Sequence, residues 1–513
     1  MSIDQISSGL RSKEFSAREI ARSYLDRIVA TDKRLGAYLD VHEDDALAQA
    51  QRVDDALTRG DDLSALAGVP MAVKDTILVS GKRCTASAKV LEPYVATYDA
   101  TAVTKLKAND AVILGKTNCD EFAMGSSMEN AALGKTVNPW DARLVPGGSS
   151  GGSAVAVASD LAVAALGSDI GGSIRQPASL CGVVGVKPTY GHVSRHGLIA
   201  MASSFDVIGP LARSVADART IFHAIRGKDR FDATSSNGDG YVRAGRAVAK
   251  LRIGVPEEFF VDGMDDDVAE RVRAAIEVIR GFGCEVEEVS LPLTKYALAA
   301  YYVLMPSEVS ANLERYDGIR YGMSVARGEE QTSLERVYFG TRTHGFGPET
   351  KRRVMLGTYA LSAGYAEQYY KRALAVRQRI KQEYRKVFEQ IDVLVTPTSP
   401  TPAWLFGAKM DDPLQMYLSD VCTVSANVAG IPGISLPCGF VERPVEPSTS
   451  SSFRVRRSAG GGEGGGVVRL PIGVQLLGRW FDEDTLFDLG EAYEQATEWH
   501  EHHPTGAEAV ATE

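Results

Sequence analysis

The sequence predicts an α/β protein in which helices cover a β-sheet. Two kinds of segment alternate along the chain: stretches with helical periodicity, and short apolar runs that end in turn residues. The 513 residues are 44% apolar and 24% charged, which is enough to bury a large core. This composition excludes a disordered or fibrous protein, and it allows either one large unit or several ordinary domains.

The N-terminal segment, residues 1–65, is predicted to be helical. Ser16 and Glu19 have the spacing of a capping box, in which each residue bonds the backbone amide of the other. Apolar residues follow at helical intervals from Ile20 to Ile28, so they lie on one face. The chain is therefore expected to open with an amphipathic helix.

Strands and helices then follow one another. Residues 68–73 are an apolar run and are predicted to form a strand. A helical stretch near 100–108 leads into a second predicted strand at 111–114. Residues 364–390 are predicted to form a long charged helix, and 391–395 a strand that ends at a Thr-Pro-Thr turn.

One segment, residues 442–468, differs in composition from the rest. It is rich in serine and glycine, and such a composition buries too little apolar surface to order itself. We predict a flexible surface insertion, because a strand-like run resumes at 470–475. The alternative, a linker between two domains, leaves fewer than fifty residues for the second domain. Residues 504–513 are predicted to be a disordered tail.

Charge and cysteine content restrict the class of protein. A formal net charge of -10 gives no bulk attraction to a polyanion, so any nucleic acid is expected to be held by a partner. The N-terminus has no apolar region, and no stretch approaches the ~18 apolar residues of a membrane span. A cytoplasmic protein is expected. The six cysteines include no C-x-x-C pair, which favours reduced, buried thiols over disulfides or a metal site.

Two Gly-Gly-Ser triplets, at 147–149 and 171–173, are the strongest functional signal, because glycine is costly where its conformational freedom is not used. A phosphate-binding loop is excluded. Gly115-Lys-Thr and Gly134-Lys-Thr resemble the end of that motif, but it requires a glycine five positions earlier, where Asp110 and Glu129 stand.

A second known motif, the nucleophile elbow G-x-S-x-G, is matched by residues 147–151. The elbow requires a strand directly before it, whereas residues 138–146 have the composition of a loop. A histidine base is also needed, and none of the downstream candidates has a distinguishing context; these are His192, His196, His223 and His344. A Ser-His-Asp hydrolase is therefore disfavoured.

Without a histidine, a serine nucleophile can use a lysine base whose pKa is lowered. A lysine near 10.4 must lose about three pKa units, a cost of about 4 kcal/mol that burial can supply. Lys74 directly follows an apolar strand, and its neighbour Asp75 is expected to point to the opposite face. Taken alone, Lys74 would be interpreted as an ordinary surface lysine at a strand end.

Lys74 together with residues 147–152 and 169–177 resembles the amidase signature family in the order and spacing of its motifs. The resemblance implies a single large α/β domain over residues 1–503, with a mixed, mostly parallel β-sheet covered by helices. It also implies a Ser-cisSer-Lys triad. In this sequence Ser173 matches the nucleophile, Ser149 the bridging serine after a cis peptide, and Lys74 the base.

The same resemblance implies how the glycines serve catalysis. The glycines before Ser173 let the backbone pass close to a substrate and turn its amides, including those of Ile170, Gly171 and Gly172, toward one point as an oxyanion hole. The implied reaction is acyl transfer from an amide to Ser173 through Ser149 and Lys74, followed by hydrolysis of the acyl-enzyme.

Within the family, the chain is similar to the branch of A subunits of glutamyl-tRNA(Gln) and aspartyl-tRNA(Asn) amidotransferases. The stretches that carry this likeness are 115–118, 120–127, 138–141, 186–195 and 351–358. The branch implies release of ammonia from L-glutamine. It also implies a B subunit that binds the tRNA and uses ATP with Mg²⁺, a small C subunit, no cofactor in this chain and no membrane.

Glutamine is a zwitterion, so its pocket requires a cation for the carboxylate and an anion for the amine. Arg353 and Asp420 match these two positions of the branch, and Tyr301 is a further candidate for the pocket. The first alternative is a stand-alone amidase for small neutral or aryl amides. The second, a catalytically silent scaffold, is disfavoured because the three triad residues are intact.

Overall fold

The computed structural model describes residues 1–327, 332–444 and 467–504. The strands are β1 (Tyr38–Val41), β2 (Pro70–Lys74), β3 (Val112–Thr117), β4 (Ala164–Asp169), β5 (Val184–Lys187), β6 (Val207–Ala212), β7 (Arg252–Pro256), β8 (Glu285–Val289), β9 (Val393–Pro397), β10 (Gly433–Pro444) and β11 (Val467–Gly478). The helices are α1 (Ile3–Ser12), α2 (Ala17–Leu35), α3 (Glu43–Arg59), α4 (Thr101–Ala108), α5 (Gly151–Ala158), α6 (Arg175–Cys181), α7 (Val215–Ile225), α8 (Asp266–Gly281), α9 (Ala297–Asn312), α10 (Leu334–Gly345), α11 (Pro348–Leu361), α12 (Tyr370–Gln390), α13 (Pro413–Leu418), α14 (Val424–Ala429) and α15 (Glu483–Ala496).

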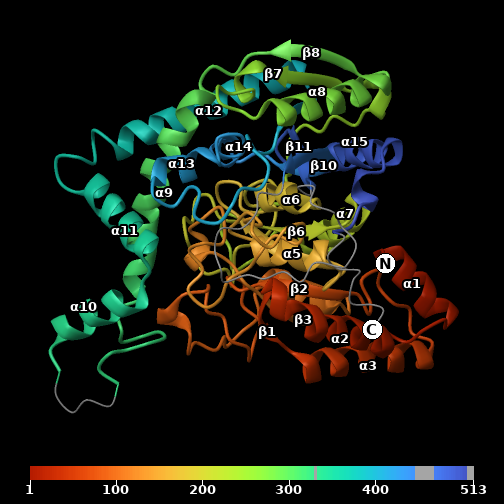
Figure 1. The fold of residues 1–513 in the computed structure, drawn as a ribbon, viewed down its shortest axis with the longest axis horizontal. Coiled ribbons are helices and arrows are strands. Elements are labelled where there is room, and N and C mark those ends of the chain that lie inside the picture. The colour runs from red at the N-terminus through yellow and green to blue at the C-terminus, as the bar shows by residue number, and fades with distance from the viewer. Residues whose placement is uncertain (328–331, 445–466, 505–513) are drawn as a thin grey trace.

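All the described strands join one sheet in the order β1-β3-β2-β4-β6-β5-β10-β11-β9-β7-β8, and helices pack around it (Figure 1). This confirms the predicted single α/β unit with a mixed sheet. The expectation that the sheet is mostly parallel is wrong, because six of the ten pairs between described strands are antiparallel. Most of the antiparallel pairs lie at the centre of the sheet. There β6, β5 and the β10–β11 hairpin separate the parallel groups β3-β2-β4 and β9-β7-β8.

The N-terminal segment contains the predicted helices and one strand that was not predicted. The Ser16 hydroxyl accepts the Glu19 amide and Glu19 accepts the Ser16 amide, so the capping box at the start of α2 is confirmed. Between α2 and α3, β1 pairs antiparallel with β3 and forms an edge of the sheet. A four-residue strand is too short to show the alternation that identifies strands in a sequence.

The other predicted elements are present with shifted ends. The strand at 68–73 is β2, which runs on to Lys74, and the helix predicted over 364–390 is α12, which begins only at Tyr370. The predicted insertion at 442–468 has its two ends in paired strands, since Pro444 of β10 pairs with Val467 of β11. Its remaining residues, 445–466, lie outside the described part of the chain, as does the predicted tail from 505 onward.

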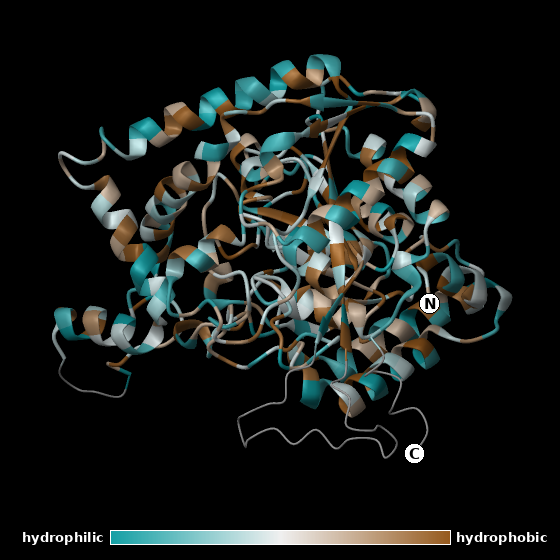
Figure 2. Ribbon diagram, turned by 45° about the horizontal axis from the view of Figure 1, so that its top comes forward, coloured by the Kyte–Doolittle hydropathy of each residue, from teal (hydrophilic) through white to brown (hydrophobic). Residues whose placement is uncertain are grey.

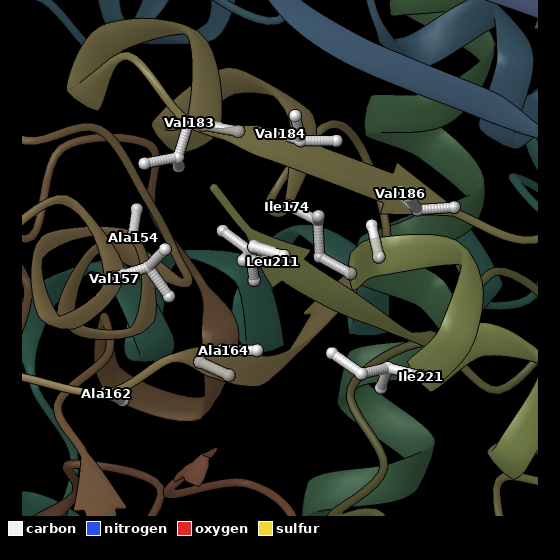
Figure 3. Close-up of a cluster of buried hydrophobic side chains, with 14 of the residues drawn as sticks. Ala154, Val157, Ala162, Ala164, Ile174, Val183, Val184, Val186, Leu211 and Ile221 are labelled. Atoms are coloured by element: carbon white, nitrogen blue, oxygen red, sulfur yellow. The ribbon is translucent and has the colours of Figure 1, made fainter. Parts of the chain in front are cut away.

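The central strands are buried on both faces, which explains their continuous apolar character. Every residue of β2 and of β4 is buried. Figure 3 shows part of the core, where Val157 of α5, Leu211 of β6, Val184 of β5 and Ile221 of α7 gather around Ile174. The segment of the chain that carries both Gly-Gly-Ser triplets is thus buried in the main hydrophobic core.

A second apolar cluster includes residues of α9 and α12, and α9 packs on both α11 and α12. Figure 1 shows α10 and α11 at the left edge, away from the sheet, and Figure 2 shows hydrophobic residues among hydrophilic ones on the helices there. We call the described part of residues 319–369 the arm. It carries eleven of the 25 exposed large apolar side chains of the described chain: Ile319, Tyr321, Leu334, Tyr338, Phe339, Met355, Leu356, Tyr359, Leu361, Tyr365 and Tyr369. None of the described helices is long and apolar enough to span a membrane.

Candidate active site

Lys74 lies at the end of β2 and is fully buried. Its Nζ is 2.8 Å from the Ser149 Oγ, 2.8 Å from the Ser150 Oγ and 3.4 Å from the Ser168 carbonyl oxygen. Burial lowers the pKa of Lys74 to about 8, against the weaker opposing effect of buried acidic groups nearby. The amine is thus surrounded by oxygen acceptors, and its neutral form is accessible near neutral pH.

Asp75 points away from this amine, as predicted for the next residue of a strand. Its Oδ1 is 3.1 Å from Nζ of the buried Lys116, and its Oδ2 accepts the backbone amide of Thr85 at 2.9 Å. The Asp75 charge is therefore paired with a different lysine. This leaves Lys74 with hydroxyl and carbonyl oxygens as its only hydrogen-bond partners among the described residues.

Ser149 is positioned by a tightly packed turn before α5. The peptide bond between Gly148 and Ser149 is cis. The Gly148 amide donates to the Gln176 Oε1 at 2.9 Å, and the Gln176 Nε2 donates to the Ser126 carbonyl at 2.9 Å. Helix α5 consists of small buried residues, and at Gly152 a Cβ would lie 2.5 Å from the Asn118 carbonyl oxygen. Because Gly152 has no Cβ, α5 can lie close to the Asn118 backbone. Ser149 and Ser150, just before α5, are thereby placed against Lys74.

Ser173 stands in the turn between β4 and α6 and is the only one of the three triad candidates with exposed surface, at 7%. Its carbonyl accepts the Ser150 amide at 3.0 Å, which joins the turn of the first triplet to that of the second. The structure thus brings Lys74 and Ser149 into direct contact, while the Ser173 hydroxyl forms no hydrogen bond with Ser149, Lys74 or any other described residue.

The backbone amides of residues 170–173 donate no hydrogen bond to any described residue. Buried amides without partners are uncommon, so this row of donors is available to a ligand. Gly172 has a φ of +141°, and a Cβ there would lie 2.3 Å from the Thr423 Oγ1. The Thr423 hydroxyl in turn donates to the Gly171 carbonyl at 2.6 Å. Only glycine fits this backbone conformation and this contact.

A buried ion pair between Arg175 and Asp169 holds the same turn in place. Arg175 donates to both carboxylate oxygens of Asp169, and Asp169 also accepts the Ile174 amide at 3.1 Å. Burial raises the pKa of Asp169, but Arg175 outweighs it and the pKa lies at about 2. The Arg175 Nη1 reaches the Gln475 Oε1 of β11 at 2.6 Å, so the turn is tied to the middle of the sheet.

The residues predicted to bind glutamine lie on elements remote from the triad in sequence. Asp420 is buried, and its carboxylate accepts the Ser126 hydroxyl at 2.8 Å and the Tyr302 hydroxyl at 3.1 Å. Burial raises the pKa of Asp420 to about 6. Arg353 is buried on α11, and its Nε donates to the Glu349 Oε1 at 2.7 Å. Both charges are thus held in fixed positions by neighbouring side chains.

Two adjacent tyrosines of α9 play different structural roles. Tyr301, the predicted residue, packs on the second triplet: a Cβ on Gly171 would lie 2.8 Å from its hydroxyl oxygen. Tyr302 is the one that bonds Asp420, and its ring stacks on that of Tyr417 with 3.9 Å between centroids. Sequence reasoning missed Tyr302 and Tyr417. One signal was available for Tyr302: adjacent residues of a helix point in different directions, so Tyr301 and Tyr302 could not both face the same group.

A cavity of about 560 Å³ lies against the Arg353 side of the site. Its lining includes Arg353, Glu349, Tyr417 and Gly125, and it does not extend to Ser173. The Tyr417 hydroxyl donates to the Glu349 Oε1 at 2.9 Å, so Glu349 links the helix of Arg353 to the tyrosine pair. The cavity wall is charged, which suits a polar ligand.

Three of the four histidines considered as bases bond other groups, and the fourth, His344, lines the cavity beside Arg353. The His192 ring bonds Glu483 at 2.9 Å, the His196 ring lies 3.2 Å from the Thr101 hydroxyl, and the His223 ring is 2.9 Å from Asp484. In the part of the chain that the structure describes, no group of three or more His, Cys, Asp or Glu side chains could hold a metal ion.

Comparisons with known proteins show the family to which the chain is similar. The amidase family matches residues 19–487. The A subunit of the glutamyl-tRNA(Gln) amidotransferase of Roseiflexus castenholzii is 51% identical over 507 residues, covering 98% of this chain and 97% of that protein. The crystal structure of the Thermotoga maritima protein of the same name is similar with a TM-score of 0.71 and 38% identity, covering 94% and 92% of the two chains. The peptide amidase of Stenotrophomonas maltophilia is 28% identical with a TM-score of 0.74, covering 97% of each chain.

Proposed function

The chain belongs to the amidase family, and within it we propose that it is the glutamine-hydrolysing A subunit of a tRNA-dependent amidotransferase. The identity of about half of all residues to proteins of that name, over nearly the full length of both chains, supports this choice. The observation that carries the chemistry is the buried Lys74 amine, 2.8 Å from the Ser149 hydroxyl and close to a turn with four free backbone amides.

The proposed mechanism is acyl transfer through the two serines. Neutral Lys74 accepts the Ser149 proton while Ser149 accepts that of Ser173, and the Ser173 Oγ forms a bond to the side-chain amide carbon of glutamine. The amides of residues 170–173 stabilise the oxyanion. Return of the proton through Ser149 to the leaving nitrogen breaks the C–N bond and releases ammonia. Water then hydrolyses the glutamyl-enzyme by the same relay.

Arg353 and Asp420 are proposed to recognise the head group of glutamine. The guanidinium is suited to the α-carboxylate, and the Asp420 carboxylate to the α-ammonium. Glu349 holds the Nε of Arg353, and Ser126 and Tyr302 hold the Asp420 oxygens, so both groups are oriented before the substrate arrives. We call residues 170–173 the oxyanion turn, and Tyr301 is proposed to cover it at Gly171.

The ammonia is proposed to serve a partner B subunit, which binds Glu-tRNA(Gln) or Asp-tRNA(Asn) and uses ATP with Mg²⁺, and a small C subunit completes the enzyme. The net charge of -10 and the exposed apolar arm support this division, because the chain offers little to a polyanion and much to another protein. No cofactor is assigned to this chain, and a cytoplasmic complex is proposed.

The test measures ammonia release by the chain in complex with its partner subunits. The rate constant kcat/KM is compared for L-glutamine and for a neutral amide of similar length that lacks the α-amino and α-carboxyl groups. We expect preference for glutamine, and a KM increase of about ten- to a hundred-fold in Arg353→Ala, since a charged hydrogen bond is lost. The matched control is Lys351→Ala, which removes a neighbouring cation of α11 whose Nζ, among the described residues, donates to the Thr343 carbonyl.

The competing function is a stand-alone amidase, which the similarity to the peptide amidase favours. It predicts that the neutral amide is the better substrate and that Arg353→Ala leaves its kcat/KM unchanged. The blank in every assay is Ser173→Ala. If Ser173→Ala retained even a few per cent of the wild-type rate, the nucleophile assignment would be wrong under either function.

A further inference from the structure

We propose that Ser150 is a positioning residue for Lys74: its hydroxyl occupies one N–H of the amine and thereby leaves the nitrogen lone pair directed at Ser149. The proposal rests on the proposed relay through Lys74 and Ser149. It adds a residue to that relay which neither the triad nor the glutamine pocket includes.

The first step of the argument is the number of acceptors around the Lys74 Nζ. Three oxygens lie near it, the Ser149 Oγ, the Ser150 Oγ and the Ser168 carbonyl oxygen. An ammonium group has three N–H donors, so the protonated lysine is fully satisfied. A neutral amine has two N–H donors and one lone pair, so one of the three oxygens must donate to the nitrogen. A carbonyl cannot donate, and the choice is between the two serines.

The second step is the set of partners of Ser150. Its Oγ donates to the Ser168 carbonyl at 3.1 Å and accepts the Ser168 amide at 3.2 Å, so the single hydroxyl proton has an acceptor in β4. The Ser149 Oγ has no hydrogen-bond partner other than Lys74 among the described residues. A buried hydroxyl proton without an acceptor is costly.

These contacts rank the two possible arrangements. If Ser149 donates to Lys74, the amine donates to Ser150, Ser150 donates to the Ser168 carbonyl, and every hydroxyl proton is bonded. If Ser150 donates to Lys74 instead, the bond from Ser150 to the carbonyl is lost and the Ser149 proton has no acceptor. The first arrangement makes one more hydrogen bond, and it is the one in which the lone pair faces the proton that catalysis must move.

The same three oxygens serve both protonation states without rearrangement. When the Ser149 proton passes to Lys74 and the Ser173 proton passes to Ser149, the amine gains its third N–H. That N–H points at the Ser149 Oγ, from which the proton came. The other two already face Ser150 and the Ser168 carbonyl. Ser150 thus fixes the direction of proton transfer before the substrate is bound.

Helix α5 provides a matched control for this role. Ser153, one turn further along, is equally buried, and its Oγ donates to the Leu166 carbonyl of β4 at 3.0 Å. Its other partner is the Thr117 Oγ1, at 2.7 Å, and it does not contact Lys74. Ser153→Ala therefore removes the same kind of buried bond between α5 and β4 and leaves the amine untouched.

The test compares Ser150→Ala with Ser153→Ala in the full complex, by ammonia release from L-glutamine over a range of pH. For Ser150→Ala we expect kcat to fall at least about ten-fold with KM within about two-fold. The acidic limb of the kcat profile should move to lower pH, because the ammonium form loses an acceptor. Ser153→Ala should keep both kcat and the limb. The ionisable groups that act on Lys74, Cys119, Asp120, Asp169 and Asp206, are the same in both variants.

Ser150→Cys keeps the size of the side chain with a weaker acceptor, and it should shift the limb in the same direction if Ser150→Ala does not fold. Thermal unfolding of each variant monitors the fold. The inference is overturned if Ser150→Ala keeps kcat within about two-fold, or if it loses activity with an unmoved limb, as a purely structural residue would. Activity retained by Ser173→Ala would instead defeat the proposed function, whatever Ser150 does.

Discussion

Around Lys74 the chain surrounds one buried amine with acceptors of its own, whereas along the arm it leaves large apolar side chains in solvent. Lys74 is fully buried with three oxygens at hydrogen-bond distance. On α10 and α11, Phe339 is 66% exposed and Met355 is 72% exposed. A soluble protein rarely exposes so concentrated an apolar patch unless another surface covers it. The groups proposed for catalysis thus all lie within this chain, whereas the arm leaves an apolar surface uncovered.

Helix α11 belongs to both regions. Arg353 on one side of it is buried and lines the cavity, while Met355, two residues further on, faces solvent. Because successive residues of a helix point in different directions, a partner that bound the exposed side would press on the helix that carries the proposed glutamine ligand. The comparison therefore predicts that the chemistry depends on groups of this chain alone, and that assembly depends on the arm.

The largest effect should come from removing the base. Lys74→Met keeps a long buried side chain and removes the amine, so we expect kcat for ammonia release to fall by about 10²- to 10⁴-fold. The thermal unfolding midpoint should be unchanged or higher, because a desolvated amine is lost. A variant with more than a tenth of the wild-type rate would show that Lys74 is not the base.

The second effect concerns the backbone of the oxyanion turn. Gly172→Ala places a Cβ against the Thr423 Oγ1 at a backbone angle that favours glycine. We expect a loss of stability of about 1–3 kcal/mol and a fall in kcat of about 10²-fold, since the amide donors move. Gly281→Ala in α8, where a Cβ meets open space, is the control and should be neutral or stabilising. Equal behaviour of the two variants would contradict the role of the turn.

The proposed role of the arm in binding partner subunits can be tested by placing a negative charge on its exposed apolar residues. Met355→Glu and Phe339→Glu should each weaken the binding of the B and C subunits by about ten-fold or more, because the glutamate would be buried in an apolar interface. Glutamine turnover by the isolated chain should stay unchanged. Val29→Glu on α2, an exposed apolar residue outside the arm, should bind the partners normally. Calorimetric titration of each variant with the partners measures the affinities, and unchanged binding by both arm variants would refute the assignment.

The smallest effect is a dependence of glutamine binding on pH. Burial raises the pKa of Asp420 to about 6, and protonation removes the charge that is proposed to hold the α-ammonium. Affinity should therefore be full above this pKa and weaken below it, by about four-fold between pH 7 and pH 5.5. Titration of the inert Ser173→Ala variant with glutamine separates this effect from Lys74. In an added Asp420→Asn change the pH dependence should vanish, and its persistence would point to another group.

The sequence predicted the parts of the site that lie in short motifs and missed those that depend on packing between distant segments. Lys74, Ser149 and Ser173 were predicted because their motifs resemble the amidase signature family in order and spacing, and their catalytic roles stay predictions. The contact of Ser150 with Lys74 could not be foreseen, since a serine beside glycines is ordinary in a turn. Tyr302 was missed because adjacent aromatic residues of one helix look alike until neighbouring elements show which one meets Asp420.

The fold shows the same division. The capping box of α2 and the apolar runs of β2 and β9 are local features, and the structure contains all three elements. The direction of strand pairs is set by crossovers that local patterns do not reveal, so the predicted predominance of parallel strands was wrong. The edge strand β1 depends on β3 for its hydrogen bonds, and nothing within its four residues indicates it.

The β10–β11 hairpin has a practical consequence for protein engineering. Its register is continuous from the Pro444–Val467 pair down to the Gly433–Leu477 pair apart from one irregularity, and Gln475 near its base holds the arginine that anchors the oxyanion turn. Because the pairing of β10 with β11 fixes that glutamine, we expect an insertion beyond the Pro444–Val467 pair to leave the oxyanion turn in place. A reporter domain or an affinity tag joined there would give a labelled enzyme that still turns over.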